Sequence, residues 1–220
     1  MTEDPANFLY PFIDEREADP AALLADLAAS ARTKEQESRE LRCSALESNA
    51  ERIADAGAQM ARLFNAGGRL FTFGNGGSCT DSAILAALFA RPPHGTPLPA
   101  WTLAADEAAL TALANDVGFE LVFSRQLIAR GRPGDIVVAL STSGNSPNLL
   151  TALAEARRGG MYTIAFAGYS GGAFAGRPDV DSCFIVESQS VHRLQEAQAF
   201  LGYRLWSLVQ EHIATKAVHG

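Results

Sequence analysis

Three apolar runs in this chain each end in a loop of glycine and small polar residues, and this pattern limits the fold more than any other feature. They are RLFTFGNGGS at 69–78, DIVVALSTSGNS at 135–146 and MYTIAFAGYSGG at 161–172. The first two lead into helical sequence, and a short apolar run, SCFIVES, follows the third. Strands that alternate with helices of about 10 to 15 residues predict an α/β fold, with a parallel sheet, right-handed crossovers and helices on both faces.

The helix after the second run has clear ends in the sequence. Pro147 stands at a position that favours the first turn of a helix, and Gly159 with Gly160 closes the segment after Arg158. We therefore predict a strand from Asp135 to Leu140 and a helix from Pro147 to about Arg158. A last helix is predicted within SVHRLQEAQAFLGYRLWSLVQEHIATKA, where leucines and Phe200 recur at a helical period.

The N-terminal part predicts helical structure outside the sheet. From Asp19 and Pro20 to about Leu63 the chain is rich in Ala, Leu, Glu and Arg. Its apolar residues recur at three- and four-residue steps and predict one buried face, in either a long helix or a helical hairpin: Leu41, Ala45, Leu46, Ile53, Ala56 and Met60. We expect an irregular N-terminal arm at residues 1–19 and no regular structure at residues 91–100.

These expectations divide the chain into an N-terminal arm and helical extension over residues 1–66 and a sheet domain over residues 67–220. A chain of 220 residues with 47% hydrophobic residues has enough material for one sizeable α/β domain. The helical extension is typical of a packing or subunit interface, so we assign it to oligomerisation.

Charge and cysteine content exclude several classes of protein. A formal net charge of -7 without any basic stripe argues against a nucleic-acid partner. The acidic N-terminus lacks the order of a secretory signal, and no uncharged apolar run is long enough for a membrane span, so we expect a cytoplasmic protein. Cys43, Cys79 and Cys183 are odd in number and form no CxxC pair, which fits a reducing compartment.

The loop STSGNS carries the clearest functional signal. Four hydroxyls, together with the N–H groups at the start of a helix, can surround a phosphate without Lys or Arg: Ser141, Thr142, Ser143 and Ser146. Each charge-assisted hydrogen bond contributes about 1.5–3 kcal/mol. The competing interpretation is an ordinary serine-rich N-cap, in which one or two hydroxyls only satisfy backbone donors.

The loop GNGGS is less specific. It lacks the lysine of a P-loop and the spacing of a GxGxxG dinucleotide fingerprint, which disfavours a dinucleotide-dependent oxidoreductase. Asn75 and Ser78 offer side chains that suit sugar hydroxyls or phosphate oxygens.

Together, GNGGS, ANDVGFELVFSRQL, STSGNSPN and RLQEAQ resemble the phosphoheptose isomerase branch of the sugar isomerase (SIS) family, over about residues 40 to 214. The resemblance implies a doubly wound, flavodoxin-like sheet of five parallel strands with an N-terminal helical extension. It also implies a homotetramer with sites between subunits and a substrate like sedoheptulose 7-phosphate. It places the phosphate at Ser141, Thr142, Ser143 and Ser146, and the sugar near Asn75, Ser78, Asp116 and Gln195.

The chain departs from that family where proton transfer takes place. The family's His and Glu on the helix after GNGGS fall on Ile84 and Leu88, and its histidines on the last helix fall on Gln198 and Tyr203. Aldose–ketose isomerisation needs groups that carry protons. A zinc that occurs in the family uses several of these positions, so we expect no metal or other cofactor here. Asp81 is expected to stabilise the start of its helix.

Two functions remain open from the sequence. The first is a phosphosugar-binding sensor or scaffold without the usual catalytic pair, with a protein partner as one option. The alternative is an active phosphosugar isomerase that uses His192 or a nearby carboxylate, although His192 also fits a surface histidine at a helix start. Glu107, Glu120 and Glu196 are interpreted as structural pairing residues.

Overall fold

The computed structural model describes residues 20–218 of the chain, which falls into two compact units, residues 1–39 and 40–220. The predicted arm at residues 1–19 lies outside the described residues. Helix α2, Pro20–Asn65, is a single helix of 46 residues, so the helical hairpin alternative is wrong. In the first unit its residues 21–39 are almost entirely exposed and include an ion pair of 2.8 Å between Arg39 and Glu35.

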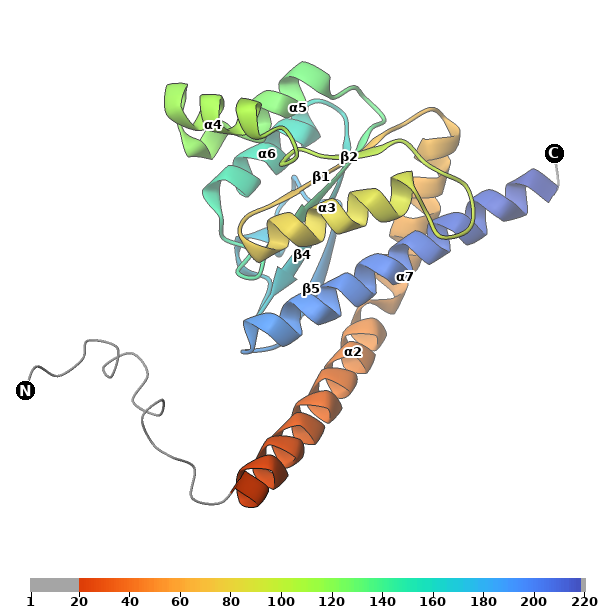
Figure 1. The fold of residues 1–220 in the computed structure, drawn as a ribbon. Helices are drawn as coiled ribbons and strands as arrows, with labels where there is room; N and C mark the ends of the chain where they lie inside the picture. The colour runs from red at the N-terminus through yellow and green to blue at the C-terminus, as the bar shows by residue number, and fades with distance from the viewer. Residues whose placement is uncertain (1–19, 219–220) are drawn as a thin grey trace, which may run out of the picture. The chain divides into compact units, whose positions relative to one another are not determined.

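The second unit contains a sheet of five parallel strands in the order β2-β1-β3-β4-β5 (Figure 1). The three apolar runs and SCFIVES each form a strand, which confirms the prediction of strands that alternate with helices; the bounds are β1 Leu70–Gly74, β3 Ile136–Leu140, β4 Tyr162–Gly168 and β5 Ser182–Val186. Every residue of β1 and β3 is buried, because both faces of the sheet are covered.

The edge strand β2, Ala100–Thr102, corrects one prediction, because residue 100 was placed in a connection without regular structure. Its three residues pair with Leu70, Phe71 and Thr72 of β1. A run this short, just after Pro99 and with an exposed Trp101, lacks the length that marks a strand in sequence. Proline is compatible with the beginning of an edge strand, where its missing N–H leaves no central ladder bond unmade.

Helices cover both faces of the sheet (Figure 1). One apolar core joins alternate strand residues to α2, to α3 (Gly77–Ala90) and to α7 (Val191–Val218); its largest buried side chains include Trp206, Phe89, Phe166 and Phe184. The other joins the opposite strand residues to α5 (Ser124–Arg130) and α6 (Pro147–Arg158). Helix α4, Glu107–Asp116, and two short 3-10 helices, η1 Phe119–Leu121 and η2 Gly172–Phe174, complete this unit.

The strand order places the two sequence motifs side by side. From β1 the chain moves outward to β2 and then returns to form β3 on the other side of β1. The carboxyl ends of β1 and β3 therefore flank the point where the strand order reverses, and Gly74 pairs in register with Leu140. In open α/β sheets this point opens a crevice where ligands bind. GNGGS and STSGNS are the loops that form its rim.

Candidate functional site

Two asparagines join these loops directly. The Asn75 amide nitrogen donates to the Asn148 side-chain oxygen at 2.9 Å, and the Asn148 nitrogen donates back to Asn75 at 2.9 Å. Asn148, the second residue of α6, is only 2% exposed. The pair fixes the spacing between the loop after β1 and the start of α6. Asn148 was not predicted as a site residue, and its place directly after STSGNSP was the only sequence signal for it.

The STSGNS loop presents its hydroxyls in different environments. Ser141 is buried, and its Oγ accepts a hydrogen bond from the Gly144 N–H at 3.0 Å. The Ser143 Oγ accepts from the Asn145 N–H at 3.2 Å, and Thr142 and Ser146 are half-buried. An accepting hydroxyl keeps its own hydrogen to donate, so these four residues retain donors for an anion.

The serine-rich N-cap interpretation fits Ser141 and Ser143, whose hydroxyls accept from backbone N–H groups of the same loop, but it does not fit Ser146. Ser146 is the N-cap residue of α6, yet its side chain makes no capping hydrogen bond. Helix α3, whose N-cap residue is Gly76, likewise has no side-chain cap. By contrast, at α4 the Asp106 carboxylate accepts from the Ala109 N–H at 3.0 Å. At two helix N-termini beside the crevice, the backbone N–H groups thus have no capping side chain as acceptor. Such N–H groups can bind an anion.

The backbone of the STSGNS loop is held from the side of β4. Gly144 has a φ of 67°, and a Cβ at that position would lie 2.3 Å from the Gly171 carbonyl oxygen, so only glycine fits there. The Asn145 side-chain oxygen accepts from the Ala173 N–H at 2.7 Å, and the Gly168 N–H donates to the Thr142 carbonyl at 3.0 Å. The segment after β4 therefore fixes the shape of the loop.

The predicted sugar-binding residues are only partly gathered. Asn75 belongs to the asparagine pair, and Ser78 is buried in the first turn of α3. Gln195 on α7 lies against the GNGGS loop, because a Cβ on Gly77 would come 2.3 Å from its amide nitrogen. Asp116 is exposed at the end of α4, where its carboxylate accepts from Asn115 at 2.8 Å. Within residues 20–218, no hydrogen bond or ion pair connects Asp116 with either loop.

Asp81 has a different role from the one predicted. Helix α3 starts at Gly77 and has no acidic residue in its first turn, so Asp81 does not stabilise the helix start as expected. Its carboxylate instead accepts a hydrogen bond from the Gln195 amide nitrogen at 3.1 Å. Burial raises the pKa of Asp81 above its ordinary value, and the Gln195 hydrogen bond lowers it by less. A carboxyl with a raised pKa is better suited to carry a proton near neutral pH.

A small hollow of about 50 Å³ lies beside Asp81, between α3 and α7. Its walls include the positions where the resemblance places proton-carrying residues: Ile84, Leu88, Gln198 and Tyr203. Gln198 donates from its amide nitrogen to the Ser141 carbonyl at 3.0 Å, while its buried Oε1 has no partner in the structure. Such an atom calls for a water or a ligand hydroxyl, and the volume is sufficient for one. The hollow is thus mostly apolar, with Asp81 and Tyr203 as its titratable groups.

His192 does not line this hollow. It is the second residue of α7 and is exposed. Of the three glutamates interpreted as pairing residues, Glu196 lies 3.9 Å from Arg42, and Glu120 accepts from the Thr151 hydroxyl at 3.2 Å. Glu107 lies in the first turn of α4, where acidic residues stabilise a helix.

The side chains around the hollow do not fit a zinc ion. Within residues 20–218 there is no group of three or more His, Cys, Asp or Glu side chains that could hold a metal. Ile84 and Leu88 have no ligand atoms, and zinc sites use Cys, His and carboxylate ligands.

Across residues 20–218, the helices fall short of the length and apolarity that a membrane crossing requires. Cys43, Cys79 and Cys183 are unpaired.

Comparison with known proteins places this geometry in a family. The SIS domain family matches residues 35–168. The chain is 40% identical over 169 residues to the phosphoheptose isomerase of Roseiflexus sp. (strain RS-1), covering 75% of this chain and 84% of that protein. It is 39% identical over 184 residues to the phosphoheptose isomerase of Aquifex aeolicus (strain VF5), covering 83% and 95%.

Solved structures agree with this placement. The phosphoheptose isomerase structure from Neisseria gonorrhoeae superimposes with a TM-score of 0.77 at 32% identity, covering 84% of this chain and 99% of that one. The structure from Francisella tularensis gives a TM-score of 0.78 at 28% identity, with 84% and 98% covered. The chain therefore belongs to the SIS domain family, in its phosphoheptose isomerase branch.

Proposed function

We propose that this chain binds a phosphosugar at the crevice between β1 and β3 and isomerises it with a substituted proton carrier, Asp81. The observation that carries this proposal is the Asp81 carboxyl, partly buried and hydrogen-bonded to Gln195, in a hollow whose other walls are largely hydrocarbon. The names of the relatives, which are phosphoheptose isomerases at about 40% identity, favour an active isomerase over a protein that only binds.

The phosphate would be held by the STSGNS loop. The hydroxyl hydrogens of Ser141, Thr142, Ser143 and Ser146 and the uncapped N–H groups at the start of α6 donate to its oxygens. The partial positive charge of the helix N-terminus favours the dianion. Asn75 and Gln195, which flank the loop, then lie where the sugar chain would pass, and Asp116 remains a predicted sugar contact that this geometry does not explain.

Asp81 would carry the carbon-bound proton. Its carboxylate removes the proton from the carbon beside the carbonyl, which gives an enediolate and a protonated Asp81. The acid returns that proton to the neighbouring carbon, while the hydroxyl proton passes between the two sugar oxygens, so no net charge is gained or lost. The Tyr203 hydroxyl, which lines the same hollow, would donate a hydrogen bond to the enediolate oxygen. The apolar walls favour the neutral form of Asp81.

A second candidate is binding without turnover, as in a phosphosugar sensor or an interaction scaffold. Ile84 and Leu88 favour it, because they place hydrocarbon where the resemblance calls for a histidine and a glutamate. In that case Asp81 would only orient Gln195.

Incubation with sedoheptulose 7-phosphate, followed by proton NMR, tests both candidates. We expect interconversion with an aldose isomer, loss of turnover in Asp81→Asn with retained phosphosugar binding, and unchanged turnover in Thr111→Ala on the exposed face of α4. Thermal shift reports binding separately, because a ligand that binds only the folded state raises its apparent stability. Binding without turnover in the unmodified chain would favour the sensor or scaffold. Turnover lost only in His192→Ala would assign the chemistry to His192, and absence of any binding would refute the phosphate site.

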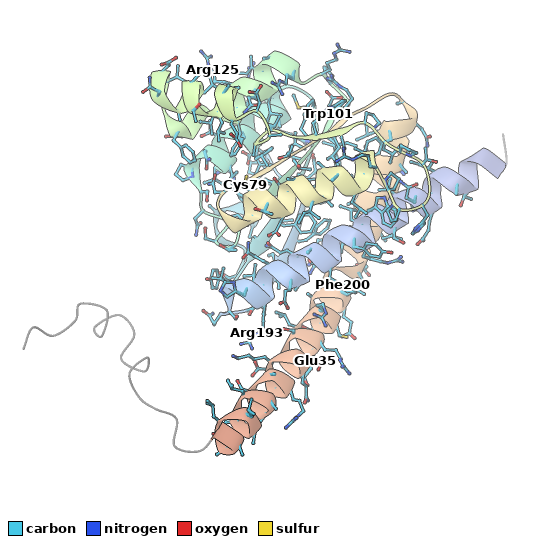
Figure 2. The ribbon with its side chains drawn as sticks, viewed as in Figure 1. Glu35, Cys79, Trp101, Arg125, Arg193 and Phe200 are labelled. Carbon is cyan, nitrogen blue, oxygen red and sulfur yellow. The ribbon has the colours of Figure 1, made fainter. Side chains whose placement is uncertain are left out.

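We also propose a homotetramer. Ile84 on α3 and Tyr203 on α7 are 61% and 47% exposed and line the same small hollow, and Phe200, which Figure 2 labels, is an exposed residue three positions before Tyr203 on α7. Apolar side chains gathered on a surface mark an interaction site. Light scattering after size-exclusion chromatography checks this, and a monomer would instead make the same surface available to a protein partner. The unpaired cysteines support the expected cytoplasmic location.

A further inference from the structure

A second hollow, of about 410 Å³, lies at the edge of the sheet opposite the crevice. It is lined by Arg69, which directly precedes β1, by Phe71 and Trp101 of the paired strands β1 and β2, and by the turn after α5, residues 129–132. The candidate phosphosugar site lies at the carboxyl ends of the strands, whereas this arginine–aromatic hollow lies at their amino ends. The two sites therefore share no residue.

The aromatic wall of the arginine–aromatic hollow is half open. Trp101 is 50% exposed, and its ring centroid lies 6.0 Å from that of buried Phe71 at an interplanar angle of 29°. The Arg69 guanidinium carbon lies 5.3 Å from the Phe71 ring centroid. Figure 2 labels Trp101 near the edge strand. Phe71 thus supports Trp101 from one side, and the exposed part of the Trp101 ring is available to stack on another flat group.

The rim of the hollow is positive. Asp135 holds Arg69 in place, accepting from its Nε at 3.2 Å and from its Nη2 at 2.6 Å. Arg130 pairs more loosely with exposed Asp106 at 3.2 Å. The backbone N–H of exposed Arg132 donates to Asp135 at 2.9 Å, whereas its guanidinium forms no ion pair or hydrogen bond with any residue from 20 to 218. Three guanidinium groups against two carboxylates leave one net positive charge in a chain whose net charge is -7.

We propose that the arginine–aromatic hollow binds a nucleoside phosphate, with the base on Trp101 and the phosphates on Arg132 and Arg130. A hollow of about 410 Å³ falls within the usual range for small-molecule sites. Guanidinium groups pair with phosphate oxygens through two parallel hydrogen bonds, and a flat base supplies the partner that the exposed indole lacks. A sugar phosphate without a base would use only the arginines, so the tryptophan favours a nucleotide.

The two tryptophans provide a direct readout. Trp206 is fully buried, so ligand-dependent quenching of indole fluorescence reports on Trp101. Titration with ADP is expected to give saturable quenching, and ribose 5-phosphate, which lacks a base, is expected to bind at least 10-fold more weakly. Loss of one charge-assisted contact in Arg132→Gln should weaken ADP binding by about 10-fold or more. Trp101→Leu, followed by equilibrium dialysis with labelled ADP, should weaken it similarly.

Arg125→Gln is the matched control. Arg125 is also an exposed arginine of the α5 region, but it does not line the hollow; Figure 2 labels it. ADP affinity should be unchanged in this variant. Equal losses in Arg125→Gln and Arg132→Gln would show general charge attraction and overturn the proposal. Equal affinity for ADP and ribose 5-phosphate, or no saturable binding of ADP at millimolar concentration, would overturn it as well. Thermal denaturation of each variant excludes unfolding as the cause.

Discussion

Asn75 and Asn148 exchange two amide hydrogen bonds of 2.9 Å across the crevice, 73 residues apart in the chain. Each amide uses one donor and one acceptor on the other, so both side chains are fixed in orientation. The pair connects the loop that follows β1 with the first turn of the helix that carries the STSGNS loop. The two sides of the candidate site are therefore held at one spacing before any ligand arrives.

Removing one member of this pair should cost stability as well as affinity. In Asn148→Ala, half-buried Asn75 loses both of its bonds, and because each hydrogen bond contributes about 0.5–1.5 kcal/mol, the two together are worth about 1–3 kcal/mol. We expect the free energy of unfolding, measured with urea, to fall by that amount and phosphosugar binding to weaken. Asn145→Ala is a useful comparison, since it breaks a bond to Ala173 on the other side of the loop. Unchanged stability in Asn148→Ala would show that the pair does not hold the loops.

Ser146→Ala should behave unlike most N-cap substitutions. Losing a serine cap usually costs about 1 kcal/mol of stability, but Ser146 makes no capping bond here. We expect an unchanged free energy of unfolding and about 10-fold weaker phosphosugar binding, because one donor to the phosphate is lost. Calorimetric titration together with urea unfolding measures both. A destabilised variant with normal affinity would restore the ordinary N-cap interpretation.

Gly144→Ala should be more harmful than a glycine substitution made for comparison elsewhere. Gly144 and Gly67 both have positive φ, 67° and 90°, so each alanine variant meets backbone strain of about 1–2 kcal/mol. Only at Gly144 would the new Cβ also approach a carbonyl oxygen, that of Gly171 at 2.3 Å, whereas nothing lies within 4 Å at Gly67. Chemical denaturation should therefore give Gly144→Ala a clearly lower free energy of unfolding than Gly67→Ala. Similar losses in the two would show that the loop relaxes freely.

The raised pKa of Asp81 has a consequence for stability with a definite sign. A carboxyl whose pKa is higher in the folded state binds more protons when folded, so stability falls as pH rises from its ordinary value of 3.8 through the raised value. At pH values above the raised pKa, the loss of stability stays constant. We expect Asp81→Asn to be more stable than the unmodified chain at pH 7 and to lose that advantage below pH 3.8. Thermal unfolding across this pH range measures the difference, and an opposite sign would mean that the carboxylate is favoured in the fold.

The cysteines should differ in reactivity. Burial raises the pKa of the Cys183 thiol to about 11, whereas Cys43 is exposed. Because the thiolate is the reactive form, iodoacetamide at pH 8 should modify Cys43 well before Cys183. Peptide mass spectrometry over time measures the order. In urea both sites should react at similar rates, and fast modification of Cys183 in the folded protein would contradict its burial.

The helices and strands that the sequence predicts well have clear local signals, such as residues that start or stop a helix. Helix α6 has the predicted bounds because Pro147 opens it and two glycines close it. The central strands were predicted from continuous apolar runs, since both faces of the sheet are covered. Strand β2 was not predicted, because three residues at a sheet edge are too few to show a strand pattern in the sequence. Its pairing with β1 depends on contacts between residues that are distant in sequence.

The sequence was sufficient to predict which loops form the candidate site, but not which side chains contact one another within it. Both glycine and serine loops meet at the switch point because strand order brings them there. The partner of Asn75 lies far along the chain, and the role predicted for Asp81 is wrong because its helix begins at Gly77, which leaves Asp81 beyond the first turn. Its bond to Gln195 spans 114 residues, and no local pattern reveals such a pair.

In the proposed function, the loops and the helix faces take separate tasks. The loops that follow β1 and β3 would hold the anion through hydroxyl and backbone N–H groups, while α3 and α7 contribute the side chains of the neighbouring hollow. Exchanges at Ile84, Leu88 or Tyr203, which line the hollow but belong to neither loop, would then alter turnover and leave the anion-binding loops unchanged. A few such exchanges would separate a catalyst from a receptor on the same scaffold.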